Sequence, residues 1–400
     1  MRLMPPLLSI DHALARVLAR ARPLDAERVP VVAAAGRVLA ENVAARVDLP
    51  PFASSAMDGF AVRAADLPGR LPVAFRIAAG LPADQPLAPG EAMEISTGGA
   101  VPEGADAVVP IEHVVEKDNE VEIAGHILSG AHVRATGGDV RAGDVLLESG
   151  TVLGAAQVGA LAAAGVADLL CARRPTVVVL STGTELRTPG DELRHGQIYE
   201  SNGPMLTAAF EAAGALVERI GPIPDDEESH RGALERGLAA DVLVSSGGVS
   251  VGPHDLVRQI LAELGVEEDF WGVAVRPGKP LAFGSRGATL VFGLPGNPVS
   301  ALVAVELFVR PALLALQGAT RPGPRYESAR LASSLRRNAA RDELVRARTR
   351  AGAGEAVLEP LTGQESHMIA RAAAADALVL VPAGEGELSA GERVRYIRLG

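Results

Sequence analysis

The chain has 400 residues and a mass of 41.1 kDa, enough for roughly two to four domains with cores of their own. It carries 49 acidic against 38 basic residues, a net charge of −11, and only 3 % aromatic residues, which disfavours binding to nucleic acid or to an anionic membrane. No stretch offers about 18 consecutive apolar residues without charges, so we expect no membrane span. The single cysteine, Cys171, excludes an internal disulfide and favours a reducing, cytoplasmic location.

The first 173 residues alternate between helical and β-rich patterns. Apolar residues recur at helical spacing from Ser9 to Ala21, which predicts an amphipathic helix with Ser9 as its N-cap. An alanine-rich stretch from Ala155 to Ala164, closed by Gly165, predicts a second helix. Short alternating runs broken by Pro and Gly lie between them. The expected domains are a β-rich insertion (46–147) and a discontinuous helical linking domain (1–45 and 148–173).

The second half of the chain shows two sequence patterns, one before and one after a linker. From Pro175 onward, continuous apolar runs such as TVVVL and DVLV alternate with helical segments, and a long helix is expected from about Pro298 to Leu316. This alternation predicts a doubly wound α/β domain over residues 174–318. The segment GATRPGPRYES reads as a linker, and the short strand-like runs after it predict a C-terminal β domain over residues 319–400. The fold class is therefore α/β plus β, in a multi-domain chain.

Polar and glycine-rich loops follow three of the predicted parallel strands. Ligands bind beyond the carboxyl ends of such strands, and backbone N–H groups and hydroxyls in these loops suit a phosphate-bearing ligand. The residues concerned are Ser181 and Gly183 in the first loop, Ser246, Gly247, Gly248 and Ser250 in the second, and Pro295, Gly296, Asn297 and Pro298 in the third. For any one loop alone, ordinary turn chemistry is the preferred explanation; three such loops at one sheet edge reverse that preference and favour a site.

Other motifs compete with this interpretation. The chain has no G-x-G-x-x-G sequence and no P-loop, which disfavours a dinucleotide-binding domain or a nucleotide-hydrolysing P-loop domain. Residues 248–252, GVSVG, match G-x-S-x-G, the pattern of a hydrolase nucleophile elbow. That hypothesis is disfavoured because Ser250 lies well past the strand end and Pro253 separates it from the next helix.

Five carboxylates stand beside glycines or in loops, where oxygen ligands can hold Mg²⁺ together with substrate phosphates. They are Asp58, Asp139, Glu185, Asp225 and Asp255. Turn formation or helix capping explains several of them equally well; Asp225 and Asp255 could each cap a helix.

Two cations lie in the stiff loop Arg276-Pro-Gly-Lys279-Pro. The chain contains 36 Arg and only two Lys, so a lysine at position 279 suggests that a compact ammonium is needed there. Arg276 and Lys279 together would suit an oxyanion. A solvated pair of loop charges is the alternative.

Seven motifs in this order resemble those of the MoeA family of molybdopterin molybdenumtransferases, which includes the E domain of gephyrin and its plant counterpart. The resemblance covers nearly the whole chain. The motifs are SSAMDGFA, STGGAVPEGADAVV, STGTEL, ESNGPML, SSGGVSVGPHD, RPGKP and GLPGNPVSA.

The resemblance implies an elongated homodimer. In this arrangement the active site lies between the α/β domain of one subunit and the insertion domain of the other, so Asp58 and Asp225 would face one cleft. It also implies a reaction in which molybdate and adenylylated molybdopterin give the molybdenum cofactor and AMP, with a divalent cation such as Mg²⁺. Molybdopterin adenylyltransferase and acceptor molybdoenzymes are the implied partners.

The resemblance further implies roles for individual residues. Asp58, Asp225, Lys279 and Arg276 would serve the chemical step, with Asp58 supplied by the partner subunit. Asp139, Glu185, Asp225 and Asp255 would hold the metal or position water. Substrate contacts would come from the three loops described above and from Thr97, Arg134, Arg346 and Ser366.

Two alternatives remain open at this stage. One is a non-catalytic molybdopterin-binding scaffold, because relatives of this family cluster receptors. The other is a molybdopterin adenylyltransferase, because that enzyme shares the SSGGVS-type domain. The absence of an appended interaction region disfavours the first, and the Asp58 motif with its β domains disfavours the second.

Overall fold

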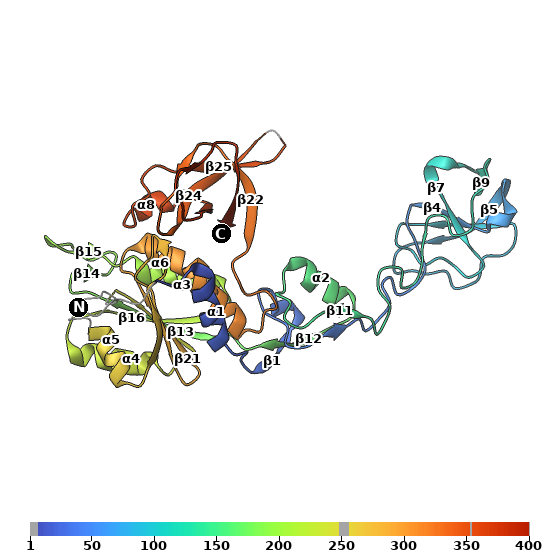
Figure 1. Ribbon diagram of the computed structural model, residues 1–400. Helices are drawn as coiled ribbons and strands as arrows, with labels where there is room; N and C mark the ends of the chain where they lie inside the picture. The colour runs from blue at the N-terminus through green and yellow to red at the C-terminus, as the bar shows by residue number, and fades with distance from the viewer. Residues whose placement is uncertain (1–6, 248–255, 353, 400) are drawn as a thin grey trace.

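The computed structural model describes residues 7–247, 256–352 and 354–399. Four parts follow one another along an elongated molecule (Figure 1). The α/β domain and the C-terminal β domain lie together at one end, a small linking module occupies the middle, and the β-rich insertion forms the other end. The multi-domain α/β plus β class predicted from the sequence is confirmed.

Helix α1 (Ile10–Arg20) begins where the sequence predicts, with the Ser9 hydroxyl accepting a hydrogen bond from the His12 N–H at 3.2 Å. Its position differs from the expectation. Ile10, Ala13 and Val17 are buried in the same core cluster as the strands of the α/β domain. The helix therefore packs on that domain because its apolar stripe finds a partner there, and it takes no part in the linking module.

The linking module joins two distant stretches of chain. Strand β1 (Ala26–Pro30) pairs antiparallel with β12 (Asp168–Ala172), and β2 (Val43–Ala44) pairs with β11 (Val145–Leu147). Helix α2 (Ala155–Ala163) packs beside them, and Gly165 ends it with a φ of +76°. The flanks of the insertion thus meet, although strand pairs contribute as much as helix to this module.

The insertion domain contains a six-stranded sheet in the order β7-β4-β6-β5-β9-β8. The strands are β4 (Gly59–Val62), β5 (Gly69–Ile77), β6 (Ala92–Ile95), β7 (Ala107–Pro110), β8 (Val115–Lys117) and β9 (Glu120–Ile123), with a separate pair formed by β3 (Ser54–Ser55) and β10 (Val133–Arg134). Gly59 is required at its position, because a Cβ there would lie 2.0 Å from the Val109 carbonyl oxygen of the neighbouring strand. This close approach fixes the turn that carries Asp58.

The α/β domain is built on a six-stranded sheet in the order β16-β13-β17-β21-β20-β18. The four predicted strands, β13 (Thr176–Thr182), β16 (Leu216–Ile223), β17 (Val242–Ser246) and β21 (Thr289–Leu294), are parallel. Side chains alternate along β13: Val177 and Val179 face one core cluster, whereas Val178 and Leu180 face another. This alternation is why helices cover both faces.

One face of that sheet packs against α3 (Asn202–Ala212) and a long helical stretch, and the other packs against α4 (Glu227–Gly237) and α5 (Leu256–Glu263). The long stretch runs through α6 (Pro298–Ala304), a π-helical segment (Val305–Val309) and α7 (Arg310–Leu316). By length and composition, Pro298–Leu316 could span a membrane, but 78 % of its most apolar window is buried inside the molecule. It forms the core helix of this domain.

Besides the four parallel strands, the sheet contains two strands in antiparallel pairings that the sequence analysis did not predict. Strand β20 (Ala282–Arg286) runs antiparallel to β21, and β18 (Glu267–Trp271) runs antiparallel to β20. A two-residue turn joins Arg286 to Thr289, and Gly287 adopts a φ of +58° in it, a conformation that favours glycine.

The C-terminal domain is a closed five-stranded barrel with β19 added to one strand. The ring is formed by β24 (Asp342–Ala351), β25 (Ala356–Pro360), β22 (Tyr326–Leu331), β28 (Arg393–Arg398) and β26 (Ala377–Val381), which pairs back to β24. Strand β19 (Val275–Arg276) comes from the α/β domain and joins β24 in parallel. Smaller elements are β14 (Leu186–Arg187), β15 (Ile198–Tyr199), β23 (Leu335–Arg336), β27 (Glu387–Leu388) and α8 (Ile369–Ala372).

Candidate functional site

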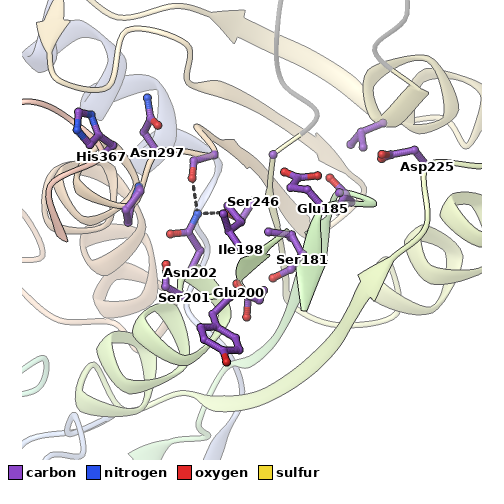
Figure 2. A pocket seen from close by; sticks show the side chains of 18 of the residues that line it. Ser181, Glu185, Ile198, Glu200, Ser201, Asn202, Asp225, Ser246, Asn297 and His367 are labelled. Atoms are coloured by element: carbon purple, nitrogen blue, oxygen red, sulfur yellow. Dashed lines mark hydrogen bonds between the residues drawn. The ribbon is translucent and has the colours of Figure 1, made fainter. Parts of the chain in front are cut away.

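A cavity of about 770 Å³ opens at the carboxyl ends of β13, β17 and β21 (Figure 2). Ser181 pairs in register with Ser246, and Ser246 pairs with Leu294, so the three polar loops begin side by side. Nine residues predicted from the sequence line this cavity. They are Ser181, Gly183, Glu185, Asp225, Ser246, Gly247, Gly296, Asn297 and Pro298.

Two glycines explain how the loops approach one another. Gly247 has a φ of +93°, and its N–H donates to the Leu294 carbonyl at 3.2 Å. Gly183 has a φ of +148°, and a Cβ there would lie 2.5 Å from the Glu185 carboxylate. A side chain at either position would strain the backbone, so glycine lets the loops keep their N–H groups close to the cavity.

Asn202, at the start of α3, ties two of the loops together. Its Nδ2 donates to the Ser246 hydroxyl at 2.7 Å and to the Gly296 carbonyl at 2.8 Å (Figure 2). Its Oδ1 is buried without a hydrogen-bond partner in the described structure. Asn202 was not predicted as a site residue, although it lies in the ESNGPML motif that carried the resemblance.

The two adjacent aspartates before α4 have different roles. Asp226 caps the helix: its side chain accepts from the Ser229 N–H at 2.8 Å, which lowers the pKa of Asp226. Asp225 instead lines the cavity and accepts from the Thr184 N–H at 3.0 Å. The capping explanation therefore belongs to Asp226, and the Asp225 carboxylate is available to a ligand.

The cavity is acidic for a site expected to hold phosphates. Glu185, Glu200 and Asp225 are among its described lining residues, which include no Lys or Arg. Two histidines that the sequence did not single out also line it. His230 is buried, with Nδ1 2.8 Å from the Asp226 carbonyl oxygen, and His367 comes from the C-terminal domain. An anionic ligand here requires positive charge from elsewhere, such as a divalent cation.

Arg346 and Ser366 lie at the border with the C-terminal domain. The Ser366 hydroxyl accepts from Asn297 Nδ2 at 2.9 Å, which places it beside the cavity. Arg346 is only 1 % exposed, and its guanidinium donates to the carbonyls of Gly363, Glu365 and Met368; burial lowers its pKa. This placement favours a role in holding the loop that carries Ser366 over direct contact with a ligand.

Arg276 and Lys279 are absent from the described lining of this cavity. Arg276 forms an ion pair with Glu343 at 2.7 Å and lines a second cavity of about 770 Å³ against the C-terminal domain. The Lys279 ammonium has no hydrogen bond or ion pair with another described residue, while its carbonyl accepts from the N–H groups of Val273 and Leu281. Pro295, in the third loop, lies next to the lining residue Gly296.

The remaining predicted residues lie in the insertion domain, at the far end of the same chain (Figure 1). Asp58 accepts from both the Thr97 N–H at 2.6 Å and the Thr97 hydroxyl at 2.9 Å, and these bonds lower the pKa of Asp58. Arg134 and Asp139 are exposed on this domain. One chain therefore brings Asp58 and Thr97 together but leaves them remote from the α/β cavity.

Three predicted residues, Gly248, Ser250 and Asp255, lie outside the described residues; Ser250 is also the serine of the G-x-S-x-G match. Within the described residues, no three His, Cys, Asp or Glu side chains converge as a metal site. Glu185 and Asp225 remain the predicted metal ligands that line the cavity.

Comparison with known proteins defines first a class and then a family. Residues 178–315 match the model of a probable molybdopterin binding domain, which places the cavity in a domain of that class. Residues 8–165 match the MoeA N-terminal region (domain I and II), and residues 328–399 match the MoeA C-terminal region (domain IV). The chain belongs to the MoeA family.

Similar proteins agree over nearly the full length. The chain is 38 % identical to Molybdopterin molybdenumtransferase 2 of Mycobacterium tuberculosis, over 96 % of this chain and 97 % of the relative. It is 34 % identical to Molybdopterin molybdenumtransferase of Haemophilus influenzae, over 97 % and 98 %. A crystal structure of the molybdopterin biosynthesis MoeA protein from Pyrococcus horikoshii superposes with a TM-score of 0.76 at 33 % identity, covering 98 % of this chain and 99 % of that one.

Proposed function

We propose that this protein is a molybdenum insertase of molybdenum cofactor biosynthesis: it transfers molybdenum from molybdate to adenylylated molybdopterin and releases AMP. The observation that carries the proposal is the cavity at the ends of β13, β17 and β21, in a chain whose full-length relatives are named molybdopterin molybdenumtransferases. Loop N–H groups and hydroxyls suit the phosphates of such a substrate.

A divalent cation such as Mg²⁺ fits the donor set of this cavity. Mg²⁺ in phosphate-transfer sites takes one or two carboxylates and completes its shell with substrate oxygens and water, so a cluster of three protein ligands is not required. Glu185 and Asp225 would hold it. When bound, the ion would neutralise charge on the phosphoanhydride that breaks. The Thr184 N–H fixes the Asp225 carboxylate at 3.0 Å, which orients it before the ligand arrives.

The second half of the site would come from another copy of the chain. Asp58 is exposed and held in place by Thr97, and the apolar side chains of Phe52, Met57 and Ile111 are exposed on the same domain. The Ile111 N–H donates to the Asp58 carbonyl at 3.0 Å, so apolar and acidic groups share one surface. A homodimer that seats this surface on the partner's cavity would bury the apolar groups and bring Asp58 to the substrate.

The remaining expectations complete the proposal. A cytoplasmic location suits the unpaired, buried Cys171. Molybdopterin adenylyltransferase would supply the substrate and molybdoenzymes would receive the product. Arg276 pairs with Glu343 of the C-terminal domain, and neither Arg276 nor Lys279 is among the described cavity-lining residues; we propose that the two cations hold the molybdate oxyanion before transfer.

The test is AMP release by the purified protein from adenylylated molybdopterin, with and without molybdate and Mg²⁺, followed by reconstitution of an apo-molybdoenzyme. Molybdate-dependent AMP release with reconstitution is expected. Tight substrate binding without AMP release under several divalent metals would contradict the proposal and favour a scaffold. ATP consumption without adenylylated substrate would instead identify an adenylyltransferase.

A further inference from the structure

Tyr199 holds an unusual position at the cavity. It is the one Phe, Tyr or Trp among the described lining residues, and the chain has only 12 such aromatic side chains in all. Tyr199 is 45 % exposed, and its neighbour Ile198 is 55 % exposed. Two large apolar side chains left open to solvent at the edge of a ligand cavity indicate a surface that another group covers.

The surrounding hydrogen bonds hold the Tyr199 ring in place. The ribbon formed by β14 and β15 is closed by the Ile198 N–H donating to the Glu185 carbonyl at 3.0 Å and the Glu200 N–H donating to the Arg187 carbonyl at 2.8 Å. At the other end of the ring, the Tyr199 hydroxyl donates to the Asp191 carbonyl at 2.8 Å. A ring anchored at both ends loses little conformational entropy when a ligand binds to its face.

The cavity lining combines charged, polar and apolar residues. Figure 2 shows Asp225 and Glu185 on one side, with Ser201 and Asn202 on the other. The carboxylates and glycine-rich loops suit the phosphates and their cation. The apolar lining residues Leu186, Ile198 and Tyr199 belong to the β14–β15 ribbon and offer nothing to a phosphate, but they suit a flat, weakly polar group.

We propose that Tyr199 is the stacking platform for the fused-ring heterocycle of the substrate, either the adenine or the pterin. This inference rests on the proposed function, since both rings belong to adenylylated molybdopterin. Stacking of a base on an aromatic side chain needs only the π-face of each ring. Tyr199 thereby sets the orientation of the substrate, with its phosphates directed toward Glu185 and Asp225.

The test measures the binding of three probes to the intact protein: AMP, 6-hydroxymethylpterin and ribose 5-phosphate, which has no ring system. Tyr199→Leu should weaken AMP or the pterin about tenfold or more and leave ribose 5-phosphate within about twofold. Tyr199→Phe, which keeps the ring but loses the bond to Asp191, should stay within about threefold. Leu193→Ala, in the segment that connects β14 to β15 and outside the described cavity lining, is the matched control and should change nothing.

The outcomes show which ring stacks on Tyr199 and whether Tyr199 acts as a platform at all. Selective loss of AMP binding assigns the platform to adenine, and selective loss of pterin binding assigns it to the pterin. If Tyr199→Leu binds both ring probes as the wild type does, the platform is refuted, and a concurrent change in sedimentation would assign the exposed ribbon to a contact between copies. If the wild-type protein binds neither ring probe, the platform is refuted, and molybdate-dependent AMP release decides the proposed function separately.

Discussion

The α/β cavity and the Asp58 surface of the insertion domain hold their functional groups in different ways. Cavity residues come from loops that are braced from within, as where Asn202 bridges Ser246 and Gly296. On the insertion domain, Asp58 is exposed, and among the described residues its carboxylate accepts hydrogen bonds only from Thr97. A concave, braced site can bind a ligand unaided, whereas an exposed carboxylate remote from it needs a second surface. This contrast is the basis of our proposal that binding and chemistry are divided between two domains.

Subunit complementation is the strongest test of whether the two domains contribute to one shared site. Asp58→Ala and Asp225→Ala should each abolish AMP release, because each removes one half of every site. Co-expression of the two variants should restore about a quarter of wild-type activity, since half of randomly formed dimers are mixed and each mixed dimer has one intact site. Activity of the co-expressed mixture is the measurement, and tagged, co-purified mixed dimers should show about half of wild-type activity.

A matched pair controls for this result. In the control, the single variants Asp58→Ala and Asp139→Ala are co-expressed, so that both changes lie on the insertion domain. If one insertion domain supplies both residues to one site, every site in a mixed dimer lacks one of them, and activity should not return. If the Asp58/Asp225 mixture recovers no activity although mixed dimers are verified, the site is not shared between subunits. Each chain would then have to bring its own Asp58 to its own cavity.

The second prediction tests the bracing of the cavity. Asn202→Leu leaves the Ser246 hydroxyl and the Gly296 carbonyl without their donor, so we expect a loss of about 1–3 kcal/mol in the free energy of unfolding and weaker AMP binding. Urea denaturation and AMP titration measure the two effects. Asn42→Ala, which removes one exposed hydrogen bond to the Ser149 N–H in the linking module, should leave AMP binding unchanged. Equal AMP affinity in Asn202→Leu and wild type would show that the loops hold their position without this bridge.

Much of the fold could be predicted because its signals are local. Helical spacing after Ser9 and continuous apolar runs for four strands depend on neighbouring residues alone. Strands β18 and β20 were missed because their assignment depends on a two-residue turn at Gly287 and on tertiary pairing. The packing of α1 on the α/β domain was missed for the same reason, since an apolar stripe does not specify its partner.

The site residues were likewise predictable only where their signal is local or follows from the strand order. The three glycine-rich loops were predicted because parallel strands bring their carboxyl ends to one edge. The sequence could not decide whether Asp225 or Asp226 caps α4, because adjacent carboxylates fit the same pattern. His230 and His367 carried no metal or catalytic spacing and join the cavity only through the fold. Tyr199 likewise becomes informative only when its exposure and anchored hydroxyl are known.

The smallest expected effect concerns the hydrogen bonds that hold Asp58. Thr97→Val keeps the backbone N–H donor and removes the hydroxyl donor, so the pKa of Asp58 should rise from its lowered value toward the ordinary value, while Thr97→Ser should preserve it. Because the folded-state pKa is lowered, ionised Asp58 favours the folded protein above the unfolded-state pKa, and this contribution is lost as pH falls through the folded-state value. In Thr97→Val that loss should begin at higher pH. Carboxyl NMR titration of the three proteins measures the shift, and identical titration of Thr97→Val and wild type would show that the backbone N–H alone holds the carboxylate.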